Sequence, residues 1–369
     1  MEIYHQFFEN APNIQFMRNV SVVRPGWMLD CDPSFTVGLL MVAQTRKAML
    51  KTNVFNQASL PLVIEPDPGE AVTPRPELLI SLYLENKSYL DNKLLEHSGL
   101  LFRGFSVASA EALERFARAV SEGDLMGYVD GTSPRTKIKT GVYTSTEYPP
   151  AYFISLHNEL SYTHQWPRRA FFCCVTAPQQ GGETPIVDSR VLLKSLPANL
   201  VERFKNKGVK YVRNLNGGAG LGPSWQSVFE TADRSVVERY CQEGGIEFKW
   251  KDGGGLWLSQ IRPAIATHPQ TGEEVWFNQA DQFHPTEMDE RTRRALLSNV
   301  REEELPKNAY FGDGDPLDAS MLDQIRDATR RQMVLFSWQM GDVLVLDNML
   351  AAHGRMPFTG PRKILVALS

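Results

Sequence analysis

The second half of the chain, from Tyr152 onward, consists of short apolar segments separated by turn residues, and this pattern limits the possible folds more than any other feature. The segments are AYFISLHNE, RAFFCCVTAP, ETPIVDS, EVWFNQ, MVLFSWQ, DVLVLDN and RKILVALS. Short runs rich in β-branched and aromatic residues, bounded by glycine, proline or aspartate, are typical of strands. A long series of them predicts an antiparallel sandwich or barrel with helices around it.

The first half of the chain alternates helical and extended patterns, so we expect a mixed α/β fold with a β-rich core. Residues 1–75 are predicted to be a partly helical N-terminal extension that packs on the core. Helical patterning spans Val37 to Phe55, and the proline-rich stretch from Ile64 to Glu77 then indicates a linker or surface crossing. Residues 76–369 are predicted to form the main domain. Its segment from about 190 to 262 has a helical and then a glycine-rich pattern, which predicts a lid insertion.

Composition and charge argue against several classes of function. The 369 residues carry a formal charge of −4, from 39 basic and 43 acidic residues without a long basic run, so nucleic acid is not expected as a partner. No apolar run is long enough for a membrane span, and the first residues lack the basic start and apolar middle of a secretory signal. Four cysteines without a CxxC pair indicate neither a disulfide framework nor a cysteine zinc site. We therefore expect a cytoplasmic protein.

A histidine and a glutamate, His157 and Glu159, stand two residues apart at the end of a predicted strand. Side chains two apart in a strand project from one face, about 6.6 Å from each other, and can lean toward a common ion. His353, just past an apolar strand, is the candidate third ligand. Two imidazoles and one carboxylate form the facial triad of non-haem Fe(II) oxygenases. The same donors also suit a zinc hydrolase, and an HxE triplet often arises by chance, so these residues alone leave the function open.

Arg362 follows His353 by nine residues and begins the last predicted strand, RKILVALS. A guanidinium there would lie near the metal and could hold a carboxylate by two parallel hydrogen bonds. This arrangement suits a dicarboxylic co-substrate whose other end chelates the metal. An arginine at a strand end is also common on protein surfaces, so both interpretations stand at this point.

Five motifs occur in a characteristic order: LFRGF, GVYTSTEYPPAYFISLHNE, GGETPIVDSR, HPQTGEEVWFNQ and GDVLVLDNMLAAHGRMPFTGPR. Together they resemble the TauD/TfdA family of Fe(II)/2-oxoglutarate-dependent dioxygenases, and most closely its SyrP-like and clavaminate-synthase-like branch. The resemblance runs from about Leu84 to Ser369. It implies a double-stranded β-helix, or jelly roll, flanked by helices.

The resemblance also implies which residues bind the cofactors. His157, Glu159 and His353 would hold Fe(II), while Thr184 and Arg362 would bind the far carboxylate of 2-oxoglutarate. The expected reaction uses O2 to hydroxylate an unactivated C–H bond of an amino acid or amino-acid-derived metabolite, free or tethered to a carrier protein, in natural-product biosynthesis. Desaturation or cyclisation by the same oxidative chemistry is the alternative. A zinc hydrolase and a non-catalytic metal-binding protein are the alternatives from other classes.

Four polar residues beside the motif strands are candidates for orienting the charged ends of an amino acid: Tyr143, Asn278, Gln279 and Arg355. A substrate site needs a small number of placed polar groups of this kind. Each of the four is equally suited to a structural hydrogen bond within the fold.

Overall fold

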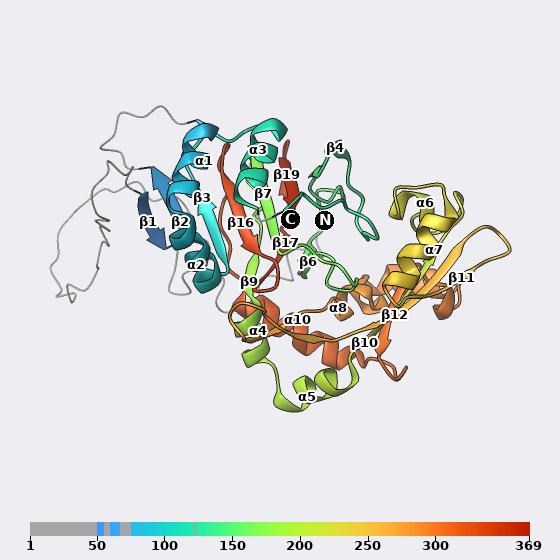
Figure 1. The fold of residues 1–369 in the computed structure, drawn as a ribbon. Helices are drawn as coiled ribbons and strands as arrows, with labels where there is room; N and C mark the ends of the chain where they lie inside the picture. The colour runs from blue at the N-terminus through green and yellow to red at the C-terminus, as the bar shows by residue number, and fades with distance from the viewer. Residues whose placement is uncertain (1–49, 55–59, 67–74, 122) are drawn as a thin grey trace. The chain divides into compact units, whose positions relative to one another are not determined.

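The computed structural model describes residues 50–54, 60–66, 75–121 and 123–369, and its largest element is an eight-stranded sheet (Figure 1). In spatial order the strands are β1 (Leu50–Val54), β2 (Leu62–Pro66), β3 (Gly99–Phe102), β16 (Val343–Asp347), β7 (Arg169–Thr176), β19 (Lys363–Leu368), β5 (Val142–Thr144) and β4 (Lys137–Lys139). Neighbouring strands are antiparallel except β2 and β3, which are parallel. The sheet thus joins segments from both halves of the chain.

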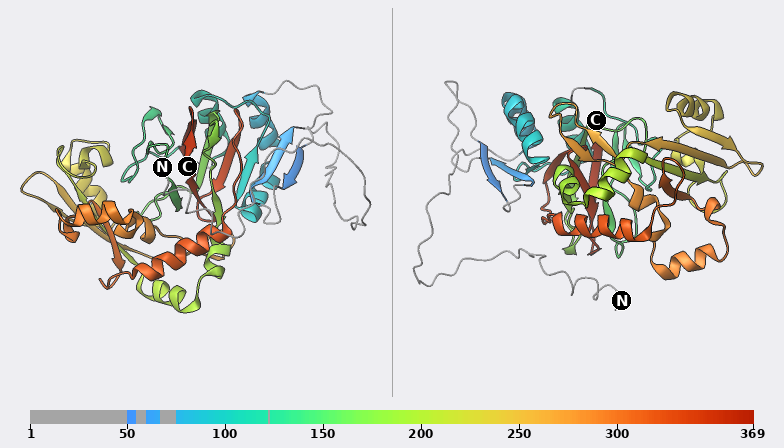
Figure 2. Two further views of the ribbon diagram at one scale, coloured as in Figure 1. Left: turned by 180° about the vertical axis from the view of Figure 1, so that it is seen from behind. Right: turned by 90° about the horizontal axis from the view of Figure 1, so that it is seen from below.

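The central strands of this sheet are buried on both faces, which explains their almost continuous apolar sequence. Successive side chains of a strand point to opposite faces. In β16, Val343 and Val345 therefore pack against three helices, whereas Leu344 and Leu346 belong to a second cluster on the other face. The three helices are α1 (Pro76–Glu85), α2 (Lys87–His97) and α3 (Ala110–Val120). Figure 2 shows them on one side of the sheet from two further directions.

A three-stranded sheet packs against the other face of the large sheet. Its strands are β6 (Ile154–His157), β17 (Ala351–Arg355) and β9 (Ile186–Asp188), with β17 antiparallel to both neighbours. Ile186 and Ala351 share one hydrophobic cluster with Phe172 and Leu344 of the large sheet. Two strand pairs extend the fold: β8 (Gln180–Gly181) with β18 (Phe358–Thr359), and β13 (Ile265–Thr267) with β14 (Glu274–Trp276). The mixed α/β jelly roll flanked by helices is confirmed.

The segment from 190 to 262, expected to be a helical and glycine-rich lid, contributes three of the four strands of a further sheet. The spatial order is β11 (Glu247–Trp250), β12 (Leu256–Arg262), β10 (Val209–Leu215) and β15 (Lys307–Phe311). The glycines of KDGGG lie in the turn between β11 and β12. The glycines therefore form a hairpin turn between two strands rather than a loop without strands, and the lid role of this segment stays a prediction.

Helices complete the second half of the chain. They are α4 (Ser189–Ser195), α5 (Ala198–Lys207), α6 (Trp225–Val228), α7 (Arg234–Glu243), α8 (Ala280–Phe283), α9 (Glu290–Leu297) and α10 (Ala319–Gln332), with 3-10 turns η1 (Pro285–Glu287) and η2 (Glu302–Glu304). Residues from α4, α5, α8 and α10 share a hydrophobic cluster with β10 and β15. None of the helices among the described residues is long and apolar enough to cross a membrane.

The expected helical patterning from Val37 to Phe55 is wrong for its last part, because Leu50–Val54 is the edge strand β1. Thr52 and Val54 are β-branched, and the segment pairs with the apolar β2, so long-range pairing outweighs the helical pattern. Residues 1–49 of the predicted extension lie outside the described residues. The domain boundary near residue 75 stays a prediction.

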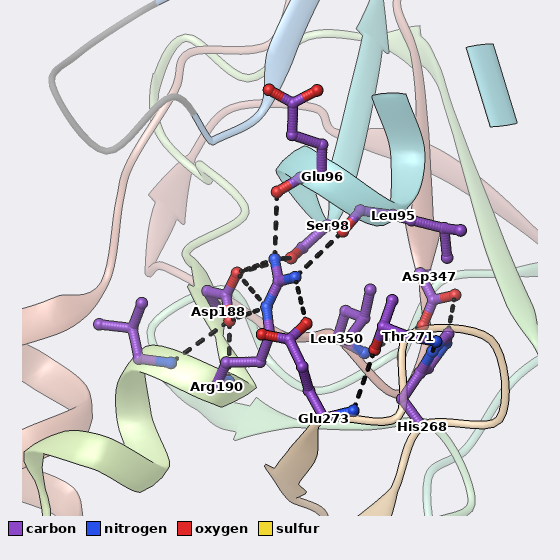
Figure 3. A network of polar contacts seen from close by, with 11 residues as sticks. Leu95, Glu96, Ser98, Asp188, Arg190, His268, Thr271, Glu273, Asp347 and Leu350 are labelled. Atoms are coloured by element: carbon purple, nitrogen blue, oxygen red, sulfur yellow. Dashed lines mark hydrogen bonds and ion pairs between the residues drawn. The ribbon is translucent and has the colours of Figure 1, made fainter. Parts of the chain in front are cut away.

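A network of polar contacts centred on Arg190 surrounds the end of β9 (Figure 3). Arg190, at the start of α4, forms an ion pair with Asp188 at 2.6 Å and one with Glu273 at 2.9 Å. It also donates to the carbonyls of Leu95 and Glu96 at the end of α2, each at 3.1 Å. One guanidinium thus fixes the end of β9 to α2 and to the β13–β14 hairpin.

Candidate active site

Two strands of the smaller sheet bring the predicted metal ligands together. His157, the last residue of β6, pairs directly with His353 of β17 in the antiparallel register, and Glu159 follows in the turn. The Oε1 atom of Glu159 lies 3.8 Å from Nε2 of His157 and 3.4 Å from Nε2 of His353. All three donor atoms lie within 4.8 Å of one another, and the three residues are buried.

These separations fit one metal ion. Donors that share an ion at bond lengths of about 2.0 to 2.2 Å lie at most about 4.4 Å apart, so small side-chain movements complete the site. The donor set, two imidazoles and one carboxylate on one face, is the set that Fe(II) oxygenases use. Asn158, between the ligands, points the other way and donates to the carbonyl of Asn348 at 2.7 Å.

The hydrogen bonds of His157 prepare it for metal binding. Its Nδ1 lies 2.9 Å from the carbonyl oxygen of Ser155. Donation of Nδ1–H to that carbonyl leaves the lone pair on Nε2, which faces the other ligands. The ring of His353 packs edge-on against Phe172, with centroids 4.7 Å apart, and burial lowers the pKa of His353 to about 4. His353 is therefore a neutral imidazole at neutral pH, as a ligand must be.

Two amides that the sequence did not single out as functional hold the backbone of the ligand turn. Asn348 accepts a hydrogen bond from the Glu159 amide at 2.7 Å and donates to the Glu159 carbonyl at 2.9 Å. Gln282 donates to the carbonyl of Ser155 at 2.7 Å, next to His157. The Asp-Asn pair that ends DVLVLDN is a turn signal in the sequence, but no local pattern connects Asn348 to Glu159.

Arg135 is a further residue that sequence reasoning missed, because it lies on an irregular segment just outside the motif that begins at Gly141. Its guanidinium forms an ion pair with the carboxylate of Glu159, and both side chains are almost completely buried. Burial alone would raise the pKa of Glu159, but Arg135 and the two imidazoles outweigh it and hold that pKa well below its ordinary value. The carboxylate is therefore ionised and ready to coordinate a cation.

A cavity adjoins the two histidine ligands and is lined by three arginines. Its lining includes His157, His353, Arg135, Thr184, Arg355 and Arg362. The structure thus brings the two predicted co-substrate residues, Thr184 and Arg362, to the predicted metal ligands. Tyr143, Asn278 and Gln279 are not among the residues that line this cavity.

Arg362 precedes β19 and is largely buried. Its Nε donates to the carbonyl of Gly182 at 3.0 Å and its Nη1 to the hydroxyl of Ser145 at 3.4 Å. Both acceptors are neutral, so these bonds orient the guanidinium without neutralising it. Burial, with a contribution from nearby Arg355, lowers the pKa of Arg362 to about 10, so it still carries its charge at neutral pH. The Thr184 hydroxyl accepts from Trp338 at 3.0 Å and keeps its own hydrogen for another acceptor.

Arg355 also lines the cavity, but two of its nitrogens hold a neighbouring segment. Nη1 donates to the carbonyl of Tyr148 at 2.9 Å, and Nη2 donates to those of Pro149 at 2.8 Å and Tyr152 at 2.9 Å. Arg355 therefore holds the segment that follows Thr146, a residue of the cavity lining. A role in substrate binding stays a prediction for Arg355.

The other three predicted substrate residues make structural hydrogen bonds. Tyr143 accepts from the Tyr128 amide at 3.0 Å, and Asn278 donates to the Ala264 carbonyl at 2.9 Å. Gln279 donates to the carbonyl of Asn158 at 2.7 Å, between the first two ligands. Gln279 thus holds the backbone of the ligand turn at Asn158. Contact of these three residues with a substrate stays a prediction.

Comparisons with known proteins agree with this geometry. A family model described as "Taurine catabolism dioxygenase TauD, TfdA family" matches residues 78–368. The chain is 38% identical over 279 residues to the dapdiamide synthesis protein DdaC of Enterobacter agglomerans, covering 76% of this chain and 84% of that protein. It is 33% identical over 328 residues to a clavaminate synthase-like protein of Arabidopsis thaliana, covering 85% and 94%. The crystal structure of PvcB from Pseudomonas aeruginosa has a similar fold, with a TM-score of 0.51 at 17% identity over 89% of this chain and 93% of that one.

Proposed function

The chain belongs to the TauD/TfdA family of dioxygenases, and on this premise we propose that it hydroxylates an unactivated C–H bond of an amino acid or amino-acid-derived metabolite. Membership in this family makes it an enzyme that uses Fe(II), 2-oxoglutarate and O2. This favours a dioxygenase over the two alternatives, a zinc hydrolase and a non-catalytic metal-binding protein. The observation that supports the proposal most is the convergence of His157, Glu159 and His353 beside the cavity that contains Arg362 and Thr184.

Each group of residues has a separate task in this reaction. His157, Glu159 and His353 would hold the metal through two imidazoles and one carboxylate. When bound, Fe(II) and 2-oxoglutarate supply the oxygen chemistry, and 2-oxoglutarate is converted to succinate and CO2. Arg362 and Thr184 bind the far carboxylate of 2-oxoglutarate through charge-assisted and hydroxyl hydrogen bonds. The burial of these side chains keeps bulk water away from the reacting atoms.

The substrate class is part of the proposal. DdaC is named for dapdiamide synthesis and aligns with most of this chain, which supports a role in natural-product biosynthesis. We place an amino-acid-like molecule in the cavity, free or tethered to a carrier protein. The retained carboxylate ligand Glu159 favours hydroxylation over halogenation, because related halogenases lack this ligand.

An anaerobic titration tests the proposed function. Addition of Fe(II) and 2-oxoglutarate is expected to produce a visible charge-transfer band, which zinc does not give. Admission of air with a panel of amino acids should then release succinate in step with one of them. Mass spectrometry of that amino acid should show the gain of one oxygen atom. The loss of two hydrogen atoms instead would indicate desaturation or cyclisation, and the absence of the band would contradict the proposal.

The Arg362→Ala variant tests the co-substrate site. It is expected to weaken 2-oxoglutarate binding about 10- to 100-fold, because charge-assisted hydrogen bonds to the far carboxylate are lost. Titration of the charge-transfer band measures this affinity without turnover. Lys363→Ala is the matched control, since Lys363 is the next residue along the chain and is exposed. Equal affinities in the two variants would show that Arg362 is not the anchor.

A further inference from the structure

Arg135 is a buried cation beside the metal ligands. It is not needed to bind 2-oxoglutarate. Its side chain is only 3% exposed and lines the same cavity as His157 and His353. The co-substrate carboxylate is accounted for by Arg362 and Thr184. Arg135 is therefore a cavity guanidinium that the far carboxylate of 2-oxoglutarate does not occupy.

The contacts of Arg135 use only part of its hydrogen-bonding capacity. Nη2 donates to the Glu159 carboxylate, and the guanidinium lies over the Tyr128 ring at 4.1 Å. The Nε and Nη1 atoms are fully buried and have no partner among the described residues. A guanidinium has five N–H donors, and buried donors are nearly always paired. Neutralising Glu159 needs only one of these nitrogens, so the other two remain to bind an acceptor.

The segment that carries Arg135 is fixed on both sides, so its position in the cavity is built into the fold. On one side, the carboxylate of Asp130 forms a buried ion pair with Arg213, and Arg213 also donates to the carbonyl of Gly131 at 3.0 Å. On the other side, the Thr136 amide donates to the hydroxyl of Thr144 in β5 at 2.8 Å. These contacts hold Arg135 against the ligands without help from a bound molecule.

The charge of the cavity indicates what Arg135 binds. Three guanidiniums, those of Arg135, Arg355 and Arg362, line the cavity, and one ligand carboxylate, that of Glu159, pairs with Arg135. A divalent metal and doubly charged 2-oxoglutarate cancel each other, so the three guanidiniums and the Glu159 carboxylate together leave two positive charges. An anionic substrate is favoured in such a site, because uncompensated charge is costly when it is buried.

We propose that Arg135 binds a carboxylate of the substrate, and that the enzyme consequently acts on a free acid in preference to its amide or ester. This inference rests on the proposed function. It makes Arg135 the residue that places the substrate next to the metal, with Nη2 on Glu159 and the N–H groups of Nε and Nη1 free for the substrate. A carboxylate is the group that suits a planar guanidinium best.

Acetate and its neutral isostere acetamide are the probes for this site. The protein is first loaded with Fe(II) and saturating 2-oxoglutarate without oxygen, so that Arg362 is occupied and the charge-transfer band is present. Each probe is then titrated and its binding is measured by calorimetry and by the shift of the band. We expect saturable acetate binding, and acetamide binding at least about tenfold weaker, the difference that corresponds to 1.4 kcal/mol.

Three variants assign the preference to Arg135. Arg135→Gln should bind acetate no better than acetamide, and Arg135→Lys, which keeps the charge beside Glu159, should retain part of the preference. Lys137→Gln removes an exposed positive charge from the same segment and should behave like the wild type. Unchanged acetate affinity in both Arg135 variants, or equal affinity of the wild type for the two probes, would overturn the inference. The band that forms before acetate is added reports on the proposed function separately.

Discussion

The Glu159→Ala variant is expected to bind Fe(II) at least about 100-fold more weakly than the wild type and to form no succinate above background. Outer partners of metal ligands already contribute about 10- to 100-fold to affinity, and a ligand itself contributes more. The variant also leaves the Arg135 guanidinium buried without its carboxylate, next to the place where a second cation must bind. The lost ligand and the unpaired positive charge both lower the affinity for Fe(II).

Anaerobic iron titration, with the charge-transfer band as the signal, measures this loss. Glu147→Ala is a suitable control, because it removes an exposed carboxylate close in sequence to the site without touching the ligands. Glu159→Gln separates the two causes, since it removes the charge but retains an acceptor for Arg135. Iron affinity and succinate formation like those of the wild type would exclude Glu159 from the ligand set.

The Arg213→Ala variant is expected to lower the free energy of unfolding by about 3 to 5 kcal/mol, the usual effect of removing one partner of a buried ion pair. The side chains of Arg213 and Asp130 are 3% and 0% exposed, so the remaining carboxylate would stay buried and unpaired. The Asp130 carbonyl would also lose its bond from Arg213 at 3.0 Å. Urea denaturation of the metal-free protein measures the change.

Arg330→Ala is the matched control for this prediction. Arg330 pairs with Asp327 at 2.9 Å on the surface of α10, with both side chains about half exposed. Exposed pairs contribute about 0 to 1 kcal/mol, so this variant should remain close to the wild type. If the two variants had the same unfolding midpoint, the Arg213–Asp130 pair would not be the anchor of the Arg135 segment. Replacing Arg213 and Asp130 together by apolar residues should recover part of the loss.

The sequence predicted the parts of the site that depend on local pattern. The strand period of two predicted that His157 and Glu159 project together, and they do converge, although β6 ends at His157 and Glu159 lies in the turn that follows. His353 follows an apolar strand that could be recognised from composition alone. The motif resemblance added Thr184 and Arg362, and the structure brings both to the cavity beside the ligands.

The residues that were missed depend on contacts between distant parts of the chain. Arg135 is one of 39 basic residues and stands on a segment without regular structure, so nothing nearby in the sequence distinguishes it. Asn348 supports Glu159 from 189 positions away. The strands between 190 and 262 could have been found, however. The alternation in VKYVRNL and the glycine turn between GIEFKW and LWLSQIR together form a strand and hairpin signal.

The direct pairing of His157 with His353 couples metal capture to the assembly of the protein. A slip of β17 by one residue would turn His353 to the opposite face of its sheet, so a mispaired molecule would hold two donors instead of three. A growing chain on the ribosome cannot form the site until the second histidine has been translated and its strand has docked. All three ligands therefore meet only in molecules with the correct strand register, and iron bound to them adds to the stability of that arrangement.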